Sequence, residues 1–176
     1  MKAKDVSIIA LATAIFTLCS WIAIPLGDTP FTLQIFALCF LSALLGVKKS
    51  IFALTAYLLL GIAGVPVFSN FTGGIARLLC PTGGFLLGFL CAAPIIGSWS
   101  QRENQSGRSL FIGMLLGLLV CYVCGCLWFW VWTPQNSLWA VLSVTVLPFV
   151  LPDLLKIIRA VWVYKRIRVL KIKTRQ

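Results

Sequence analysis

The sequence predicts an all-α integral membrane protein, a bundle of six transmembrane helices. Of the 176 residues, 60% are hydrophobic and only 11% are charged, with a mean hydropathy of +1.01, whereas soluble domains carry about 25% charged residues. The hydrophobic residues fall into six runs, each near the ~20 residues that cross ~30 Å of hydrocarbon. Nothing resembles a soluble linker with a second domain, so residues 1–176 are expected to form one transmembrane domain.

Short polar or basic interruptions separate the six runs. The first follows Lys2, Lys4 and Asp5 and has 19 residues. This is more than the ~7–15 of a signal-peptide core, so we expect it to remain as a helix. The fifth ends in three closely spaced tryptophans, as expected at a membrane–water interface. The predicted spans are residues 6–24, 31–47, 50–67, 82–99, 110–132 and 138–164, and residues 165–176 form a basic tail.

The net charge of +11 is better explained by orientation in the membrane than by nucleic-acid binding. With six spans, 12 of the 15 basic residues fall on the side of both termini, and the opposite loops hold only Arg77. Because cytoplasmic loops carry the excess of Lys and Arg, we expect both termini of this multi-pass protein in the cytoplasm. The 12 residues are Lys2, Lys4, Lys48, Lys49, Arg102, Arg108, Lys165, Arg166, Arg168, Lys171, Lys173 and Arg175.

Residues 65–89 (VPVFSNFTGGIARLLCPTGGFLLGF) join the third span to the fourth on the predicted outer side. Their paired glycines and their prolines disfavour regular helix. Irregular backbone at membrane depth is tolerated only where protein buries it or where it lines a cavity. We therefore interpret this stretch as one wall of a binding site between helices. The alternative is a long extramembrane hairpin.

Asp153 and Lys156 are the only opposite-charge pair well inside an apolar run. An acid near the bilayer centre costs about 2.5–3.5 kcal/mol on insertion scales, so it needs a partner or a function. At i, i+3 the two side chains share a helix face and can pair. Pro148 and Pro152 predict a break in the last span there, which would place Asp153 near a half-helix N-terminus that favours an anion. A purely structural ion pair is the alternative.

Three further polar residues are candidates for ligand contacts. Arg77 can face an anionic group or extend to lipid headgroups. Asn70 and Gln34 can each donate and accept, either to a ligand or between helices. In the first span, Ala10 and Ala14 form a small-residue face of the kind that lets helices approach closely.

Catalysis is poorly supported by the sequence. The chain has no histidine, so nucleophilic schemes lack their usual base. Its four acidic residues are scattered and no nucleotide-binding loop is present, so we expect neither an enzyme nor a chain that itself uses ATP. The seven cysteines fit apolar packing better than disulfides or a metal site, and we expect no cofactor or metal.

Four stretches together resemble the BioY family, the biotin-binding S components of energy-coupling factor (ECF) transporters. They are PFTLQIFALCFLSALLG (30–46), YLLLGIAGVPVF (57–68), TGG…PTGGFLLGF (72–89) and PDLLK (152–156). The fifth span and the tail match little beyond hydropathy. The resemblance implies a six-helix subunit that captures biotin from outside and works with a transmembrane coupling subunit and paired ABC ATPases. Some family members are thought to act without that module. The alanine face of the first helix would contact the coupling subunit.

Biotin offers two ureido N–H donors and a carbonyl, an apolar sulfur-containing ring and a carboxylate. Asp153 is the candidate acceptor for the N–H groups, and Asn70 or Gln34 the candidate donors to the carbonyl. Lys156 or Arg77 is the candidate partner of the carboxylate. The remaining predicted contacts are Thr32 and the apolar walls Phe31, Tyr57, Phe68 and Phe85. The alternatives are an S component for another small vitamin, a lipid-modifying enzyme, or a membrane scaffold protein without transport activity.

Overall fold

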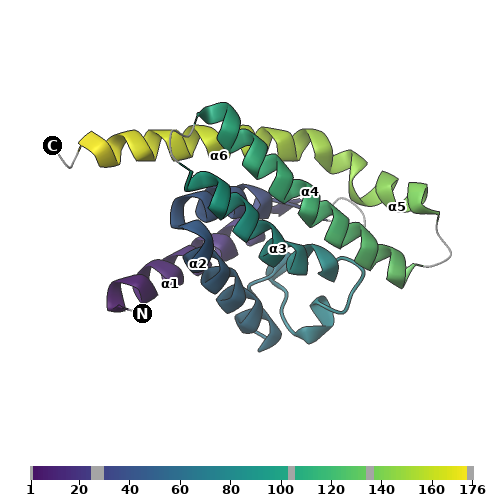
Figure 1. Cartoon of the computed structure of the whole chain (residues 1–176). Coiled ribbons are helices and arrows are strands. Elements are labelled where there is room, and N and C mark those ends of the chain that lie inside the picture. The colour runs from purple at the N-terminus through teal and green to yellow at the C-terminus, as the bar shows by residue number, and fades with distance from the viewer. Residues whose placement is uncertain (1, 25–29, 103–105, 134–136, 174–176) are drawn as a thin grey trace.

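The computed structural model describes residues 2–24, 30–102, 106–133 and 137–173. These residues contain six α-helices, which confirms the predicted all-α bundle (Figure 1). Two short strands, β1 (Ala23–Ile24) and β2 (Phe31–Thr32), pair antiparallel at the point where the second span was expected to start as helix. The helices are α1 (Ala3–Trp21), α2 (Gln34–Ile62), α3 (Gly83–Ser100), α4 (Gly107–Trp132), α5 (Leu138–Thr145) and α6 (Leu147–Lys173).

The second and third predicted spans lie in the single helix α2, which a sharp break at Gly46 divides. Gly46 has φ 73° and ψ −178°, a conformation essentially restricted to glycine. Gly97 of α3 packs against Val47 at this point and holds the break in place. Within the described residues, four helices can cross a membrane and the bent pair α5–α6 gives a fifth span. The break in α2 lies next to the predicted boundary between the second and third spans, and the number of helices, six, agrees with the prediction.

The last span is broken at Val146, slightly earlier than the prolines predicted. α5 and α6 meet there at an angle of 42°. Pro148 lies in the first turn of α6, where its missing N–H costs nothing. Pro152 lies one turn further inside the continuous helix. Asp153 is therefore in the second turn of α6, near the N-terminus of this half of the span.

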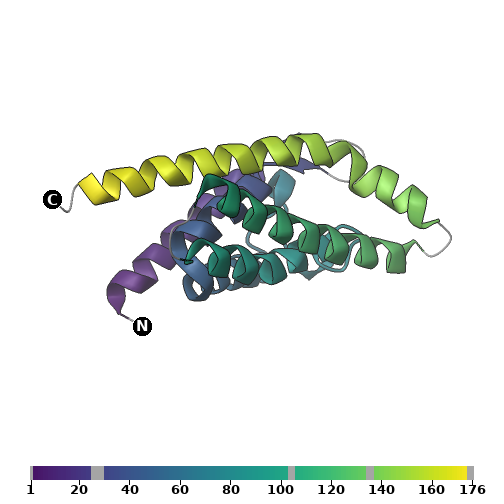
Figure 2. The ribbon, with the colours of Figure 1, turned by 45° about the horizontal axis from the view of Figure 1, so that its top comes forward.

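α3 and α4 run side by side through the middle of the molecule (Figure 2). Glycines make the close approach possible: a side chain at Gly113 would overlap the Trp99 ring, and one at Gly125 would overlap Phe85. Ala92 and Ile96 of α3 are fully buried beside this interface. The α3–α4 pair thus forms a rigid wall on which Phe85 is positioned.

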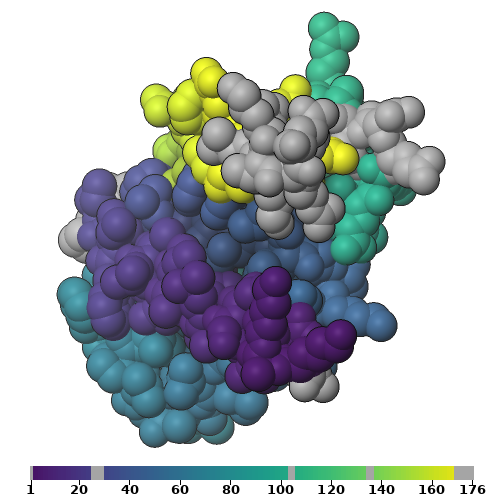
Figure 3. Space-filling view, turned by 90° about the vertical axis from the view of Figure 1, so that its left-hand side faces the viewer, coloured from purple at the N-terminus to yellow at the C-terminus, as the bar shows by residue number. Residues whose placement is uncertain are grey.

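α1 has two different faces. Its inner face carries the buried hydroxyl residues Thr13, Thr17 and Ser20. Thr13 Oγ1 donates to the Ala53 carbonyl of α2 at 3.0 Å, and Ser20 Oγ donates to the Val67 carbonyl. The outer face exposes Ala10 and Ala14, and the end view in Figure 3 shows α1 lying across the surface of the molecule. α1 is therefore fixed on one side and open on the other.

Basic segments gather at one end of the bundle. Lys49 Nζ lies 2.7 Å from the Asp5 carboxylate near the start of α1. A side chain at Gly107 would meet Lys165, which places the start of α4 beside the C-terminal part of α6. The start of α1 and the end of α6 lie at this same end (Figure 1). Helix α6 continues into the predicted basic tail as far as Lys173.

The opposite end is covered by residues 63–82, which we call the glycine-rich segment. It contains two short 3₁₀ helices, Ser69–Phe71 and Ile75–Arg77, and a Phe68–Thr72 bridge closes the chain around the first of them. The Gly74 N–H donates to the Gly61 carbonyl at 2.7 Å, and Trp21 Nε1 donates to the Pro66 carbonyl at 2.8 Å. These bonds fold the segment back over the ends of α1 and α2.

Candidate ligand-binding site

A cavity of about 80 Å³ lies between the glycine-rich segment and the helices. It has room for several water molecules, since one water needs roughly 10–15 Å³. Its walls come from β2, the start of α2, the glycine-rich segment, α3, α4, α5 and α6. The lining residues are Pro30, Thr32, Gln34, Ile35, Phe68, Ser69, Arg77, Thr82, Phe85, Leu86, Phe89, Tyr122, Thr145, Phe149, Asp153 and Lys156.

An acid, a base and a phenol meet at one side of this cavity. Lys156 Nζ donates to Asp153 Oδ1 at 2.7 Å, and Tyr122 Oη donates to Asp153 Oδ2 at 2.7 Å. Asp153 is 3% exposed and Lys156 7%. A buried carboxylate is tolerated when it is paired and hydrogen-bonded, and here each oxygen has one partner. Each oxygen still keeps a lone pair with which it can accept from a ligand.

Phe31 lies on the far side of Lys156 from the cavity. Lys156 Nζ lies 3.7 Å from the centre of the Phe31 ring, a cation–π contact that steadies the ammonium group. Phe31 and Lys156 also line a separate apolar groove between α2 and α6. In this structure Phe31 thus supports the lysine rather than forming a wall of the cavity.

Gln34 is held by neighbours on both sides of its amide. Thr32 Oγ1 donates to Gln34 Oε1 at 3.0 Å, and Gln34 Nε2 donates to Tyr57 Oη at 2.8 Å. Tyr57 is fully buried behind the cavity, where its ring packs edge-on against Phe68 and Phe16. One amide hydrogen of Gln34 remains for a further acceptor.

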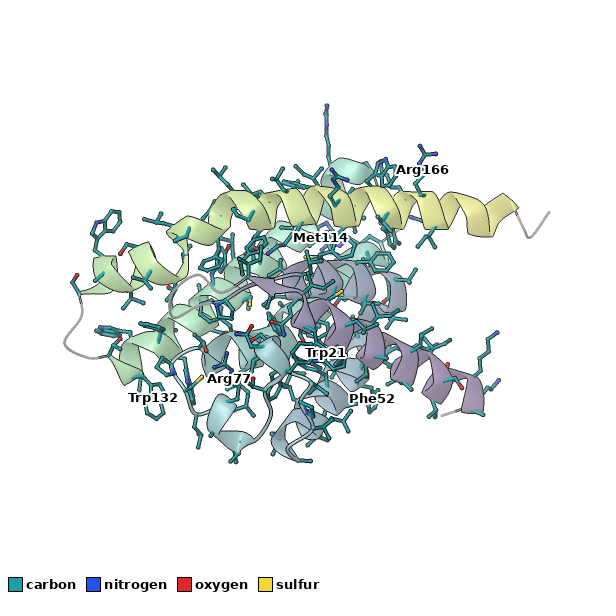
Figure 4. All side chains as sticks on the ribbon, turned by 180° about the vertical axis from the view of Figure 1, so that it is seen from behind. Trp21, Phe52, Arg77, Met114, Trp132 and Arg166 are labelled. Atoms are coloured by element: carbon teal, nitrogen blue, oxygen red, sulfur yellow. The ribbon has the colours of Figure 1, made fainter. Side chains whose placement is uncertain are left out.

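Arg77 and Phe68 bring the glycine-rich segment into the site. Arg77 Nη2 donates to Ser69 Oγ at 3.3 Å, and both side chains line the cavity. Figure 4 shows Arg77 beneath the helices, at the end of the molecule that also carries Trp132 and opposite to Arg166. The Phe68 ring is 1% exposed and sits where any side chain on Gly61 would be.

The structure brings together most of the predicted contact residues. The seven that line the cavity are Thr32, Gln34, Phe68, Arg77, Phe85, Asp153 and Lys156. Tyr57 lies behind the wall and Phe31 beyond Lys156, as described above. Asn70 is exposed, with φ 59°, and is not among the lining residues.

Tyr122 is the main lining residue that sequence reasoning missed. It lies in the fifth span, outside the recognisable motifs. A tyrosine in the middle of an apolar run was a usable signal, because a buried phenol needs a hydrogen-bond partner. Its partner, Asp153, is 31 residues away in the sequence, and no local spacing could reveal the contact.

The arrangement is suited to binding rather than to chemistry. One buried acid, two cations and one amide face a chamber with aromatic walls, the mixture found in small-molecule pockets. Within the described residues, no group of three or more His, Cys, Asp or Glu side chains could hold a metal ion. The fold and the site together define a membrane-embedded solute-binding protein.

The chain belongs to the BioY family, which matches residues 1–172. A probable biotin transporter BioY from Pyrococcus horikoshii is 36% identical over 168 residues, 96% of this chain and 98% of that protein. The biotin transporter BioY of Thermotoga maritima is 40% identical over 164 residues, 92% of this chain and 94% of that protein.

A solved structure shares the whole fold. The crystal structure of the S-component for biotin from an ECF-type ABC transporter matches with a TM-score of 0.85 and 26% identity. The match covers 96% of this chain and 94% of the other. The family resemblance and the six-helix fold expected from the sequence are thereby confirmed, and the chain is a multi-pass membrane protein of a transporter family.

Proposed function

We propose that this protein is the substrate-binding S component of a biotin uptake system and that residues 1–176 act as one transmembrane domain. The observation that carries the proposal is the cavity in which Asp153, Lys156 and Arg77 face aromatic walls, in a chain of the BioY family. The protein has no catalytic activity of its own. An ATP-driven ECF module supplies the energy where such a module is present.

The side chains around the cavity complement the functional groups of biotin. Asp153 accepts from a ureido N–H group, because its oxygens keep free lone pairs. The spare amide hydrogen of Gln34 suits the ureido carbonyl. Arg77, whose side chain donates only to Ser69 Oγ within the described residues, suits the carboxylate because a guanidinium can bind it in a bidentate manner. Phe68 and Phe85 enclose the apolar ring.

Orientation follows from charge. The basic end of the bundle faces the cytoplasm, with both termini, and the glycine-rich segment faces outward in the cytoplasmic membrane. Biotin enters from the outer side and the glycine-rich segment closes over it. The exposed Ala10 and Ala14 on α1 contact the transmembrane coupling subunit, because small residues allow close helix approach.

The direct test is calorimetric titration of the detergent-purified protein with biotin. We expect saturable one-site binding that Asp153→Asn weakens at least about tenfold, the loss typical of a charged hydrogen bond in a buried site. Asp5→Asn is the matched control, because it removes an acid from an exposed ion pair far from the cavity. Unchanged affinity in Asp153→Asn would contradict the proposed site.

A competition panel separates the other functions. Thiamin, riboflavin and lipoate should fail to displace biotin. Tight binding of one of these in place of biotin would indicate an S component for another vitamin. If none of the four binds, the protein is better described as a scaffold without a ligand.

A further inference from the structure

A second hollow of the surface lies between the start of α2 and the first half of α6, and we call it the α2–α6 groove. Its volume is about 360 Å³, within the ~300–1,000 Å³ typical of ligand sites. Six of its eight lining residues are apolar. Leu33 and Phe36 line it from the side of α2, and Leu151 and Leu155 line it from α6, where they are 74% and 64% exposed. This lining suits a hydrocarbon chain.

Arg159 is the available cation of the α2–α6 groove. The other cation of the lining, Lys156, is bonded to Asp153 and lies against Phe31. Arg159 is exposed, and among the described residues none makes an ion pair or a ring contact with it. A cation inside an apolar span is unfavourable unless an anion accompanies it. Arg159 is thus available to an anion from outside the chain.

The cation and the apolar wall follow one another in the order of the head and tail of a lipid. Arg159 lies at the end of the groove that points toward the basic end of the bundle, where Lys165 lies beside the start of α4. From Arg159 the apolar wall runs through Leu155 to Leu151, a length of about 12 Å at 1.5 Å per residue. One leaflet contributes about 15 Å to the hydrocarbon layer, half of its ~30 Å. The groove therefore has the length of an acyl chain in one leaflet.

The same face of α6 continues from the groove toward the basic end. Leu155, Arg159, Trp162 and Arg166 follow at intervals of three or four residues, which places them on one side of the helix. The Arg166 guanidinium lies 5.3 Å from the centre of the exposed Trp162 ring. Tryptophan and arginine are residues that anchor a helix at the headgroup level of a membrane. A phosphate at Arg159 would therefore have a second guanidinium on the same face, two turns away.

We propose that the α2–α6 groove binds an anionic phospholipid from the leaflet at the basic end of the bundle. Its phosphate lies on Arg159, because a guanidinium binds phosphate oxygens in a bidentate manner. One acyl chain lies along Leu155 and Leu151. Anionic lipids are favoured over zwitterionic ones, because the latter carry their own cation beside the phosphate. The site is separate from the cavity, and the proposal does not depend on which solute the cavity binds.

A second copy of the chain is a poorer occupant of the groove. The chain has only four acidic residues. The two that the structure describes, Asp5 and Asp153, are already paired with lysines. Within the described residues, a second copy therefore offers no unpaired acid to Arg159, whereas a lipid phosphate supplies the missing charge.

The experiment is native mass spectrometry of the full chain in micelles that contain phosphatidylglycerol or phosphatidylcholine with identical acyl chains. We expect Arg159→Gln to lower the affinity for phosphatidylglycerol about fivefold, the typical contribution of one cation near the membrane surface, and to leave that for phosphatidylcholine unchanged. Arg159→Lys should keep most of the affinity, because it keeps the charge. Glycerol 3-phosphate, which has the phosphate but no chain, should not compete.

Arg168→Gln is the matched control. It removes an exposed arginine from the opposite side of the same helix, since nine residues make two and a half turns. It should change the affinity for phosphatidylglycerol by less than about twofold. An equal loss in both glutamine variants would reveal an effect of net charge alone and would overturn the site.

Three other results would also overturn the proposal. They are unchanged affinity for phosphatidylglycerol in Arg159→Gln, competition by glycerol 3-phosphate, and lipid-free dimers that Arg159→Gln dissociates, which would make the groove an interface between copies. Each variant is compared with itself across the two lipids, so a general loss of stability cannot imitate the expected result. Biotin is absent throughout, so failure here is independent of failure of the proposed function.

Discussion

Two ion pairs with the same Nζ–carboxylate distance, 2.7 Å, differ completely in their surroundings. The side chains of Asp5 and Lys49 are 31% and 37% exposed, whereas those of Asp153 and Lys156 are 4% and 7% exposed. An exposed pair gains little because water and salt screen it. A buried pair is expensive to break because one partner is left charged without compensation.

For the buried pair we predict that Lys156→Met lowers the free energy of unfolding by about 3–5 kcal/mol. The double variant Asp153→Leu with Lys156→Met should recover most of that stability, because an apolar pair of similar volume replaces the charges. Thermal unfolding in detergent measures the stability. Biotin titration should show no binding by the double variant, and retained binding there would contradict a ligand role for the pair.

For the exposed pair we predict that Asp5→Asn leaves the melting temperature within about 2 °C of the unmodified protein at moderate salt. The Asp5 side chain is partly in solvent, and Lys49 has water as an alternative partner. The measurement is the same thermal unfolding experiment. A large drop would show that this contact fixes α1 to the break in α2.

At the scale of the elements, the break inside helix α2 depends on a single glycine. Gly46 adopts φ 73°, and a side chain there would also overlap Gln101. We predict that Gly46→Ala destabilises the protein by about 1–3 kcal/mol through backbone strain. Gly107→Ala is the control, because its added carbon meets only the flexible end of Lys165. Equal melting temperatures for the two variants would contradict the strain argument.

The packing of Phe68, which forms one wall of the cavity, against Gly61 of α2 gives a second prediction for the elements. Gly61→Ala places a carbon that overlaps the Cζ edge of the Phe68 ring, so the ring must move into the cavity or away from it. We expect a stability loss of about 1–3 kcal/mol from overpacking, together with weaker biotin binding. Gly113→Ala creates the same kind of clash with Trp99, whose ring does not line the cavity. That control should lose stability but keep its affinity for biotin.

Sequence reasoning succeeded where a signal is local. Apolar runs, basic interruptions and the i, i+3 spacing of Asp153 and Lys156 predicted the bundle and the buried pair. It failed where backbone geometry or distant contacts decide the outcome. In the sequence, Gly46 cannot be distinguished from any other glycine that precedes a basic turn. Phe31 was expected to begin the second span as helix, but it lies in strand β2. The Tyr122–Asp153 bond joins helices far apart in the chain.

For the whole molecule, the distribution of charge predicts orientation. The charge distribution places the C-terminus in the cytoplasm. We therefore expect a green fluorescent protein fused after Gln176 to fluoresce, and an alkaline phosphatase fused at the same point to be inactive. Phosphatase activity at this position would reverse the assignment and place the glycine-rich segment on the inner side. Reporter activity in intact cells measures the outcome directly.

The two faces of α1 have a mechanical consequence. Near its end, Ser20 and Trp21 are bonded to carbonyls of Val67 and Pro66, while Ala10 and Ala14 point outward two to three turns earlier. We therefore expect a partner that binds at those alanines and tilts α1 to displace the glycine-rich segment as well, because both are attached to the same helix. Partner binding and the opening of the glycine-rich segment would then be coupled directly through helix α1.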